Sequence, residues 1–234
     1  SSLQEPTWSS TSAKNSAARQ ENNYTEVLRL FHLNDYGYRI MYFIFENIQD
    51  YDEVTGAANF SSTYEIGNYG SVYAIDNDTL SNVNGKHEIT HFIVDNYFGF
   101  GAPGPFKWLI GEGLAVWSEN EWNRTDLYEY AAKKLISNEI SSPYFIVSHP
   151  EAQKIQQNIY PMAGAFTKYM VETYGLPKYL NLYQRGFNIE SFRLIFGRSF
   201  YDENLLFEQF LIKKLHSLNK IHTPSNFVPE SKLK

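Results

Sequence analysis

A pair of histidines in the segment His-Glu-Ile-Thr-His, residues 87–91, constrains the fold of this chain more than any other feature. Residues four apart in an α-helix lie one above the other, so His87 and His91 direct their imidazoles at one point when the segment is helical. Zinc binds neutral histidine nitrogens and carboxylate oxygens, and a catalytic zinc keeps one position for water. Glu88, beside the first ligand, is then the expected general base that takes a proton from this water.

The residues around the pair fit an amphipathic helix. Asn82 or Asn84 is the expected N-cap, and the glycines and prolines of residues 99–105 are expected to end the helix. The apolar positions predicted for its buried face are Ile89, Phe92, Ile93 and Tyr97.

Glu112 is the expected third metal ligand. It lies in the sequence Trp-Leu-Ile-Gly-Glu-Gly-Leu-Ala, residues 108–115, which predicts a second amphipathic helix. Gly111 and Gly113 flank it, and two glycines in one helical turn predict that two helix backbones approach closely around the metal. The alternative is that Glu112 lies on a solvated helix face.

Residues 87–115 resemble the gluzincin metallopeptidases, which hold zinc with an HExxH helix and a glutamate on the following helix. The segment around Glu112 is similar to the aminopeptidase N type and to small bacterial domains of the peptidase MA-like group. It departs from them by one extra residue between Trp108 and Glu112. The resemblance implies one zinc ion per chain, held by His87, His91 and Glu112, and hydrolysis of peptide bonds with Glu88 as the base.

The resemblance continues in two later segments and has two clear departures. Residues 160–175 resemble the helix that follows the metal site in these domains, and residues 192–200 resemble the turn before their last helix. The chain lacks the Gly-x-Met-Glu-Asn segment with which aminopeptidases hold a free amine, and Val116 stands where the thermolysin pattern has an aspartate. These departures favour an endopeptidase that is neither an aminopeptidase nor a thermolysin relative.

Four more side chains are candidates for the site. Tyr160, which precedes Pro161 at a predicted helix start, is the expected donor to the oxyanion of the transition state. His149 is a rival for this role. Asp95, one turn after His91, and Glu119, two turns after Glu112, are expected to contact the metal ligands and fix their orientation without binding the metal themselves.

Residues 62–76 predict short strands and a turn just before the histidine pair. In gluzincins the strand in this place is an edge strand that pairs with an extended substrate. Backbone pairing with a peptide is available to any exposed sheet edge. The residues expected to bind substrate in this way are Gly70, Ser71, Val72 and Tyr73, and the alternative is an ordinary sheet strand.

The expected fold class is α+β: a zincin-like arrangement of a small N-terminal mixed sheet and a helix packed on an α-helical C-terminal half, with the active site between them. The sequence predicts a disordered tether at residues 1–25, one domain at residues 26–220 and a tail at residues 221–234. The predicted elements are a strand at residues 26–32, a helix at 36–51, and later helices at 126–136, 161–174, 177–185 and 202–217.

Composition narrows the classes of function. A net charge of −6, without a basic stripe, argues against nucleic acid as a partner. The resemblance to the gluzincins implies a peptide or protein substrate. The absence of cysteine excludes disulfides and thiolate metal sites. Apolar runs are too short for a membrane span. The polar N-terminal segment resembles the linker of an exported or lipid-anchored bacterial protein, so we expect a monomer that is exported or associated with the cell envelope. The alternative is a cytoplasmic protein with a loose N-terminus.

Two other interpretations stay open at this point. The chain could be a catalytically silent domain of the same fold that contains zinc and binds a peptide or an envelope component. The metal could instead be a structural staple, or the histidine pair could be accidental.

Overall fold

The computed structural model describes residues 10–34, 39–45, 47–56, 61–66, 69–75, 84–99, 105–149, 159–186 and 188–222. The elements in chain order are α1 (Ser10–Leu30), β1 (Arg39–Phe45), α2 (Ile48–Thr55), β2 (Ser61–Ile66), β3 (Tyr69–Ile75), α3 (Asn84–Phe98), α4 (Pro105–Glu119), β4 (Glu121–Trp122), β5 (Thr125–Asp126), α5 (Leu127–Ile136), α6 (Pro143–Ser148), α7 (Tyr160–Tyr174), α8 (Leu176–Arg185), α9 (Ile189–Phe196) and α10 (Phe200–His222).

A small mixed sheet precedes the helical half of the chain, which confirms the α+β class. Its strand order is β1-β3-β2, with β1 parallel and β2 antiparallel to β3. Helix α3 packs on this sheet. The approach is close because Gly70 has no side chain: a Cβ there would lie 1.9 Å from a ring carbon of Phe92.

Helix α1 corrects two predictions. Residues 26–32 were expected to form a strand, and residues 1–25 a disordered tether, but Ser10–Leu30 is one helix that packs on α3. The sequence of α1 shows no apolar period, because the first residues on the buried face of this helix are polar. The residues of that face are Ser16, Gln20, Val27 and Phe31, at helical spacing. Residues 1–9 lie outside the described part of the chain.

Strand β1 corrects a third prediction, a helix at residues 36–51. Burial alternates along Arg39–Phe45, as in a strand with one face against the core, and a separate helix begins at Ile48. Ile40 and Ile44 have a helical spacing in the sequence, but both lie on the inner face of the strand. A short run that is apolar on both faces fits either period, and pairing with β3 decided between them.

The helical half follows the predictions closely. Helices α5, α7, α8 and α10 match the expected segments within about three residues at their starts, which is the usual precision of such boundaries. Asp126 caps α5 with its side chain, and Gly175 at φ 86° follows the end of α7. Helices α6 and α9 and the β4–β5 hairpin were not predicted. The predicted tail begins inside α10, and residues 223–234 lie outside the described part of the chain.

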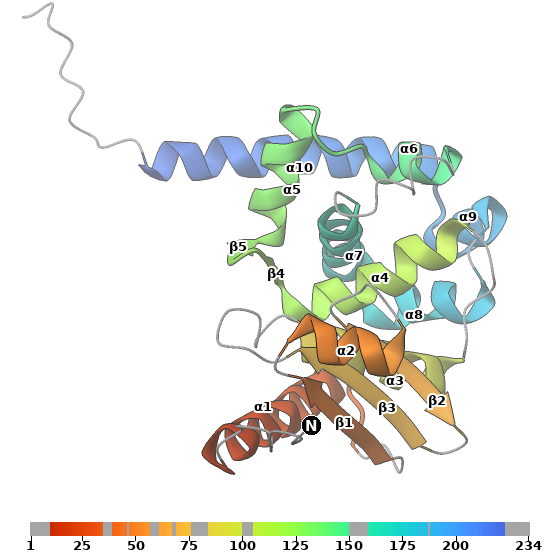
Figure 1. The fold of residues 1–234 in the computed structure, drawn as a ribbon. Coiled ribbons are helices and arrows are strands. Elements are labelled where there is room, and N and C mark those ends of the chain that lie inside the picture. Colours follow the sequence, from red (N-terminus) through yellow and green to blue (C-terminus); the bar gives the residue numbers. More distant parts are fainter. Residues whose placement is uncertain are drawn as a thin grey trace, which may run out of the picture.

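Helix α4 connects the two halves of the molecule. It packs on α3 on one side and on α7 on the other, and in Figure 1 it lies between the sheet and the upper helices. Helix α10 crosses the top of the molecule in Figure 1 and packs on α5. A centre built from α3 and α4 therefore lies where the sheet half meets the helical half.

Candidate metal centre

The histidine pair lies on α3, as predicted. Helix α3 begins at Asn84, so Asn84 belongs to the first turn of the helix and is not its N-cap. The other N-cap candidate, Asn82, lies outside the described residues. Ile89, Phe92 and Ile93 are buried on the core side of the helix. Tyr97 does not belong to that face, since it is 38% exposed. The expectation for Tyr97 was therefore wrong.

Glu112 on α4 meets both histidines. Its Oε2 atom lies 3.0 Å from His87 Nε2 and 3.2 Å from His91 Nε2, and the two Nε2 atoms are 3.2 Å apart. The structure thus brings together the three residues expected to bind the metal. Among the residues that the structure describes, they form the one group of three or more His, Cys, Asp or Glu side chains arranged to hold an ion.

The triangle of ligand atoms fits a tetrahedral ion. Zinc bonds of about 2.0–2.2 Å at tetrahedral angles separate neighbouring ligand atoms by about 3.3 Å. The three observed distances, 3.0, 3.2 and 3.2 Å, are close to this value. Two imidazole nitrogens and one carboxylate oxygen also match the ligand set of catalytic zinc sites, which leave the fourth position open.

Charges within the group favour a carboxylate beside an imidazolium when no metal is bound. Burial lowers the pKa of His91, but the hydrogen bond and the negative charge of Glu112 outweigh it and raise that pKa to about 9. Burial alone would raise the pKa of Glu112, yet the hydrogen bonds with His87 and His91 hold it well below its usual value. A metal ion would therefore displace a proton from this group.

Two further carboxylates lie close to the histidines. Glu88 is buried, with 8% of its surface exposed, on the same helical turn as His87. Glu119 Oε2 lies 4.0 Å from His87 Nδ1, and its Oε1 atom is buried without a hydrogen-bond partner among the described residues. Burial and the nearby charge of Glu88 raise the pKa of Glu119. The structure thus places Glu119 behind the first histidine, at a distance longer than a hydrogen bond.

Asp95, one turn after His91 on α3, has a partner from α8. The hydroxyl of Tyr183 donates a hydrogen bond to Asp95 Oδ1. The charge of Asp95 also raises the pKa of His91. The expected support from Asp95 is therefore electrostatic, and Tyr183, which the sequence did not single out, holds this carboxylate in place.

A buried hydroxyl pair joins the two ligand helices. The Thr90 hydroxyl on α3 donates to Ser118 Oγ on α4 at 2.8 Å, and the Lys86 carbonyl oxygen also lies 2.8 Å from Thr90 Oγ1. The Ser118 hydroxyl donates to the Ala115 carbonyl at 2.6 Å. Such a contact sets the position of α3 along α4, and hence the distance between the histidines and Glu112.

The two glycines beside Glu112 have different roles. A Cβ at Gly113 would lie 2.3 Å from Thr167 Oγ1 and 2.9 Å from the Ala163 carbonyl oxygen, both on α7. A Cβ at Gly111 would meet nothing within 4 Å. The predicted close helix approach is thus correct for Gly113, though toward α7 rather than around the metal, and wrong for Gly111.

Tyr160 lies at the start of α7 beside the centre. Its ring centroid is 6.3 Å from that of His87. The Tyr160 ring also stacks on Trp122, with centroids 6.2 Å apart and planes at 22°. The rival His149 is exposed at the end of α6 and stacks on Phe145, with centroids 4.1 Å apart. Of the two candidates, Tyr160 is the one whose ring lies beside a candidate metal ligand.

The predicted substrate-binding strand is not an edge. Residues 70–73 belong to β3, which lies in the middle of the sheet. Gly70 is opposite Ile40 of β1 on one side and Glu65 of β2 on the other, and the pairing continues through Tyr73. Strand addition at Gly70, Ser71, Val72 and Tyr73 is therefore excluded, because both sides of the strand are already paired.

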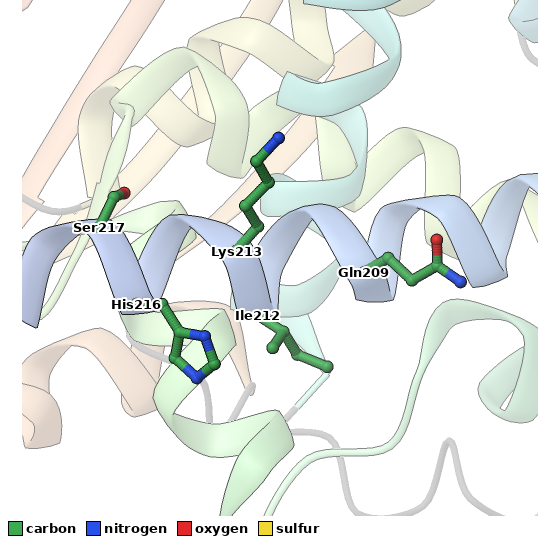
Figure 2. Close-up of a pocket in the computed structure, with 5 residues that line it drawn as sticks. All are labelled: Gln209, Ile212, Lys213, His216 and Ser217. Carbon is green, nitrogen blue, oxygen red and sulfur yellow. The ribbon is translucent and has the colours of Figure 1, made fainter.

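A surface hollow elsewhere contains none of these residues. It runs along the outer side of α10, and the described residues that line it all come from that one helix (Figure 2): Gln209, Ile212, Lys213, His216 and Ser217. Within the described residues, no helix is both long enough and apolar enough to cross a membrane.

Comparison with protein families, with curated proteins and with solved structures found no match. The function is therefore argued from the geometry of the centre alone.

Proposed function

We propose that this chain is a zinc-dependent endopeptidase with a zincin-like fold. The observation that carries the proposal is the convergence of one oxygen and two nitrogens from α3 and α4 to within 3.0–3.2 Å of one another, with the buried Glu88 one residue from the first histidine. This ligand set, with an acidic side chain beside it, is the arrangement that metal-assisted hydrolysis requires.

The roles of the side chains follow from their positions. His87, His91 and Glu112 would hold one zinc ion, which when bound acts as a Lewis acid toward water and the substrate carbonyl. Glu88 accepts a proton from the attacking water and passes it to the leaving amine as the peptide bond breaks. Tyr160 donates a hydrogen bond to the carbonyl oxygen, where negative charge builds. Glu119 and Asp95 keep the two histidines oriented.

The sheet supports a peptide as substrate. In the described part of the sheet the outer strands are β1 and β2, and of these β2 packs on α3. An extended peptide could add to an unpaired edge of a strand beside the metal helix. Strand β2 thus replaces β3 as the candidate for this contact.

The test combines metal analysis with cleavage profiling over a diverse peptide library. We expect about one zinc ion per chain, and a loss of about 10²–10⁴-fold in kcat for Glu88→Gln with zinc content unchanged. Chelation should abolish hydrolysis and added zinc should restore it. Glu190→Gln is the matched control, because it makes the same chemical change at an exposed carboxylate on α9.

Other outcomes would contradict the proposal. Full activity in Glu88→Gln would exclude the mechanism. Bound zinc without cleavage of any peptide would favour a catalytically silent binding domain. No bound metal, with a melting temperature unaffected by chelation, would show that the histidine pair is accidental.

A further inference from the structure

Trp122 lies just beyond the end of α4 and contacts Tyr160, which lies beside the candidate centre. It lies in β4, two positions after Asn120, where α4 has ended. Its indole stacks on Tyr160, and Tyr160 in turn approaches His87 at 6.3 Å between ring centroids. The three rings therefore form a continuous row from the hairpin to the metal ligands.

The hairpin that carries Trp122 is held at both ends. Its turn has both central residues in the left-handed region, Asn123 at φ 50° and Arg124 at φ 61°, which is the geometry of a type I′ turn. At its far end, Asp126 accepts a hydrogen bond from the amide of Tyr128 and pairs with Lys168 on α7 at 2.8 Å. The indole thus comes from a short, fixed element tied to the same helix that begins with Tyr160.

The position of Tyr160 allows a neighbouring ring to affect its orientation. It is the first residue of α7, it is only partly buried, and Ile159 before it offers no side-chain cap. An oxyanion donor must lie within hydrogen-bond distance of one position of the reacting oxygen. A fixed ring stacked on one face restricts the rotation of the tyrosine, as edge and face contacts between aromatic rings do.

We propose that Trp122 is a positioning residue that holds Tyr160 beside His87, so that the β4–β5 hairpin sets the orientation of the oxyanion donor. The proposal rests on the proposed function, because it assigns a partner to Tyr160 in that mechanism. It concerns a residue without any metal-binding or acid–base group.

The stack is tested first, in metal-free protein and without substrate. Tyr160→Ala should uncover the indole and shift the tryptophan emission to longer wavelength. The same substitution in a Trp122→Phe background should produce no shift. Trp117→Phe is the matched background, since Trp117 lies on α4 but packs edge-on against Phe31, 5.9 Å away. A shift that persists without Trp122 would overturn the proposal.

Kinetics test the positioning role. Trp122→Ala should lower kcat by about 10–100-fold, as displacement of a reacting group does, and should leave KM and zinc content unchanged. Trp122→Phe should retain most of the activity, and Trp117→Phe all of it. The double variant Trp122→Ala/Tyr160→Phe should be no slower than Tyr160→Phe alone, because both changes remove the same interaction. If Trp122→Ala does not fold, Trp122→Leu replaces it.

The outcomes separate this proposal from the proposed function. Unchanged kcat in folded Trp122→Ala, or a higher KM with unchanged kcat, would overturn the positioning role and leave the zinc mechanism intact. A wild-type protein that binds zinc and cleaves nothing would refute both, whatever the fluorescence shows.

Discussion

His91 and Glu112 stabilise each other's charged forms when no metal is bound. The pKa of His91 is raised from 6.5 to about 9, so its contribution to stability is fully present below pH 6.5 and is lost as the pH rises through 9. The pKa of Glu112 is lowered from 4.5, so its contribution is present above pH 4.5 and is lost as the pH falls. The metal-free centre therefore stabilises the fold most between pH 4.5 and pH 6.5.

Metal binding at this centre should depend on pH for the same reason. Zinc needs a neutral His91, so below the pKa of about 9 each zinc ion should release about one proton from this residue. We expect the zinc affinity to rise with pH between 6.5 and 9. Calorimetric titration in two buffers of different ionisation enthalpy measures the proton count. A count of zero at neutral pH would contradict the charge state assigned to His91.

On helix α4, residues that are neighbours in the sequence pack against different parts of the molecule. Its Glu112 faces α3, Gly113 touches α7, and Gly111 faces open space. The two glycines therefore make a matched pair in the same helical turn. Any difference between their variants reports packing rather than helix propensity.

We expect Gly113→Ala to destabilise the protein by about 1–3 kcal/mol, because the new methyl group would overlap the backbone of α7. Gly111→Ala should instead stabilise it by about 0.5–1 kcal/mol, because alanine favours the helix and meets no other atom. Urea unfolding of both variants measures the difference. Equal effects of the two substitutions would show that α4 and α7 are farther apart than described.

The whole molecule includes an N-terminal helix that the sequence did not predict. Phe31, just after α1, is 3% exposed and packs on Phe98 of α3 and Trp117 of α4. Lys86 on α3 also pairs with Glu26 on α1 at 2.8 Å. The N-terminal segment is therefore part of the core that supports both ligand helices.

Phe31→Ala should destabilise the protein by about 3–5 kcal/mol, because it opens a cavity between α1, α3 and α4. Leu194→Ala is the control: this side chain is 72% exposed on α9, and its loss should change stability by less than about 0.5 kcal/mol. Chemical denaturation of the metal-free proteins measures both. Similar values for the two variants would mean that residues 10–34 are not part of the folded core.

The sequence by itself determined helix α3, the three side chains that meet as a candidate metal site and most of the C-terminal helices. These follow from spacing within a few turns of helix, which is a local property. Tyr160, which the sequence singled out, lies with its ring centroid 6.3 Å from that of His87. Its role as oxyanion donor remains a prediction.

Only the tertiary structure decided which strand is central, which face of α1 is buried and which aromatic side chain reaches Tyr160. Strand order depends on pairing between distant segments, so Gly70 could not be placed in the middle of the sheet from its neighbours. Ser16 and Gln20 are buried by contact with α3, which no apolar period indicates. The hairpin of Trp122 lacks glycine in its turn and therefore gave no local signal, although it lies beside the candidate centre.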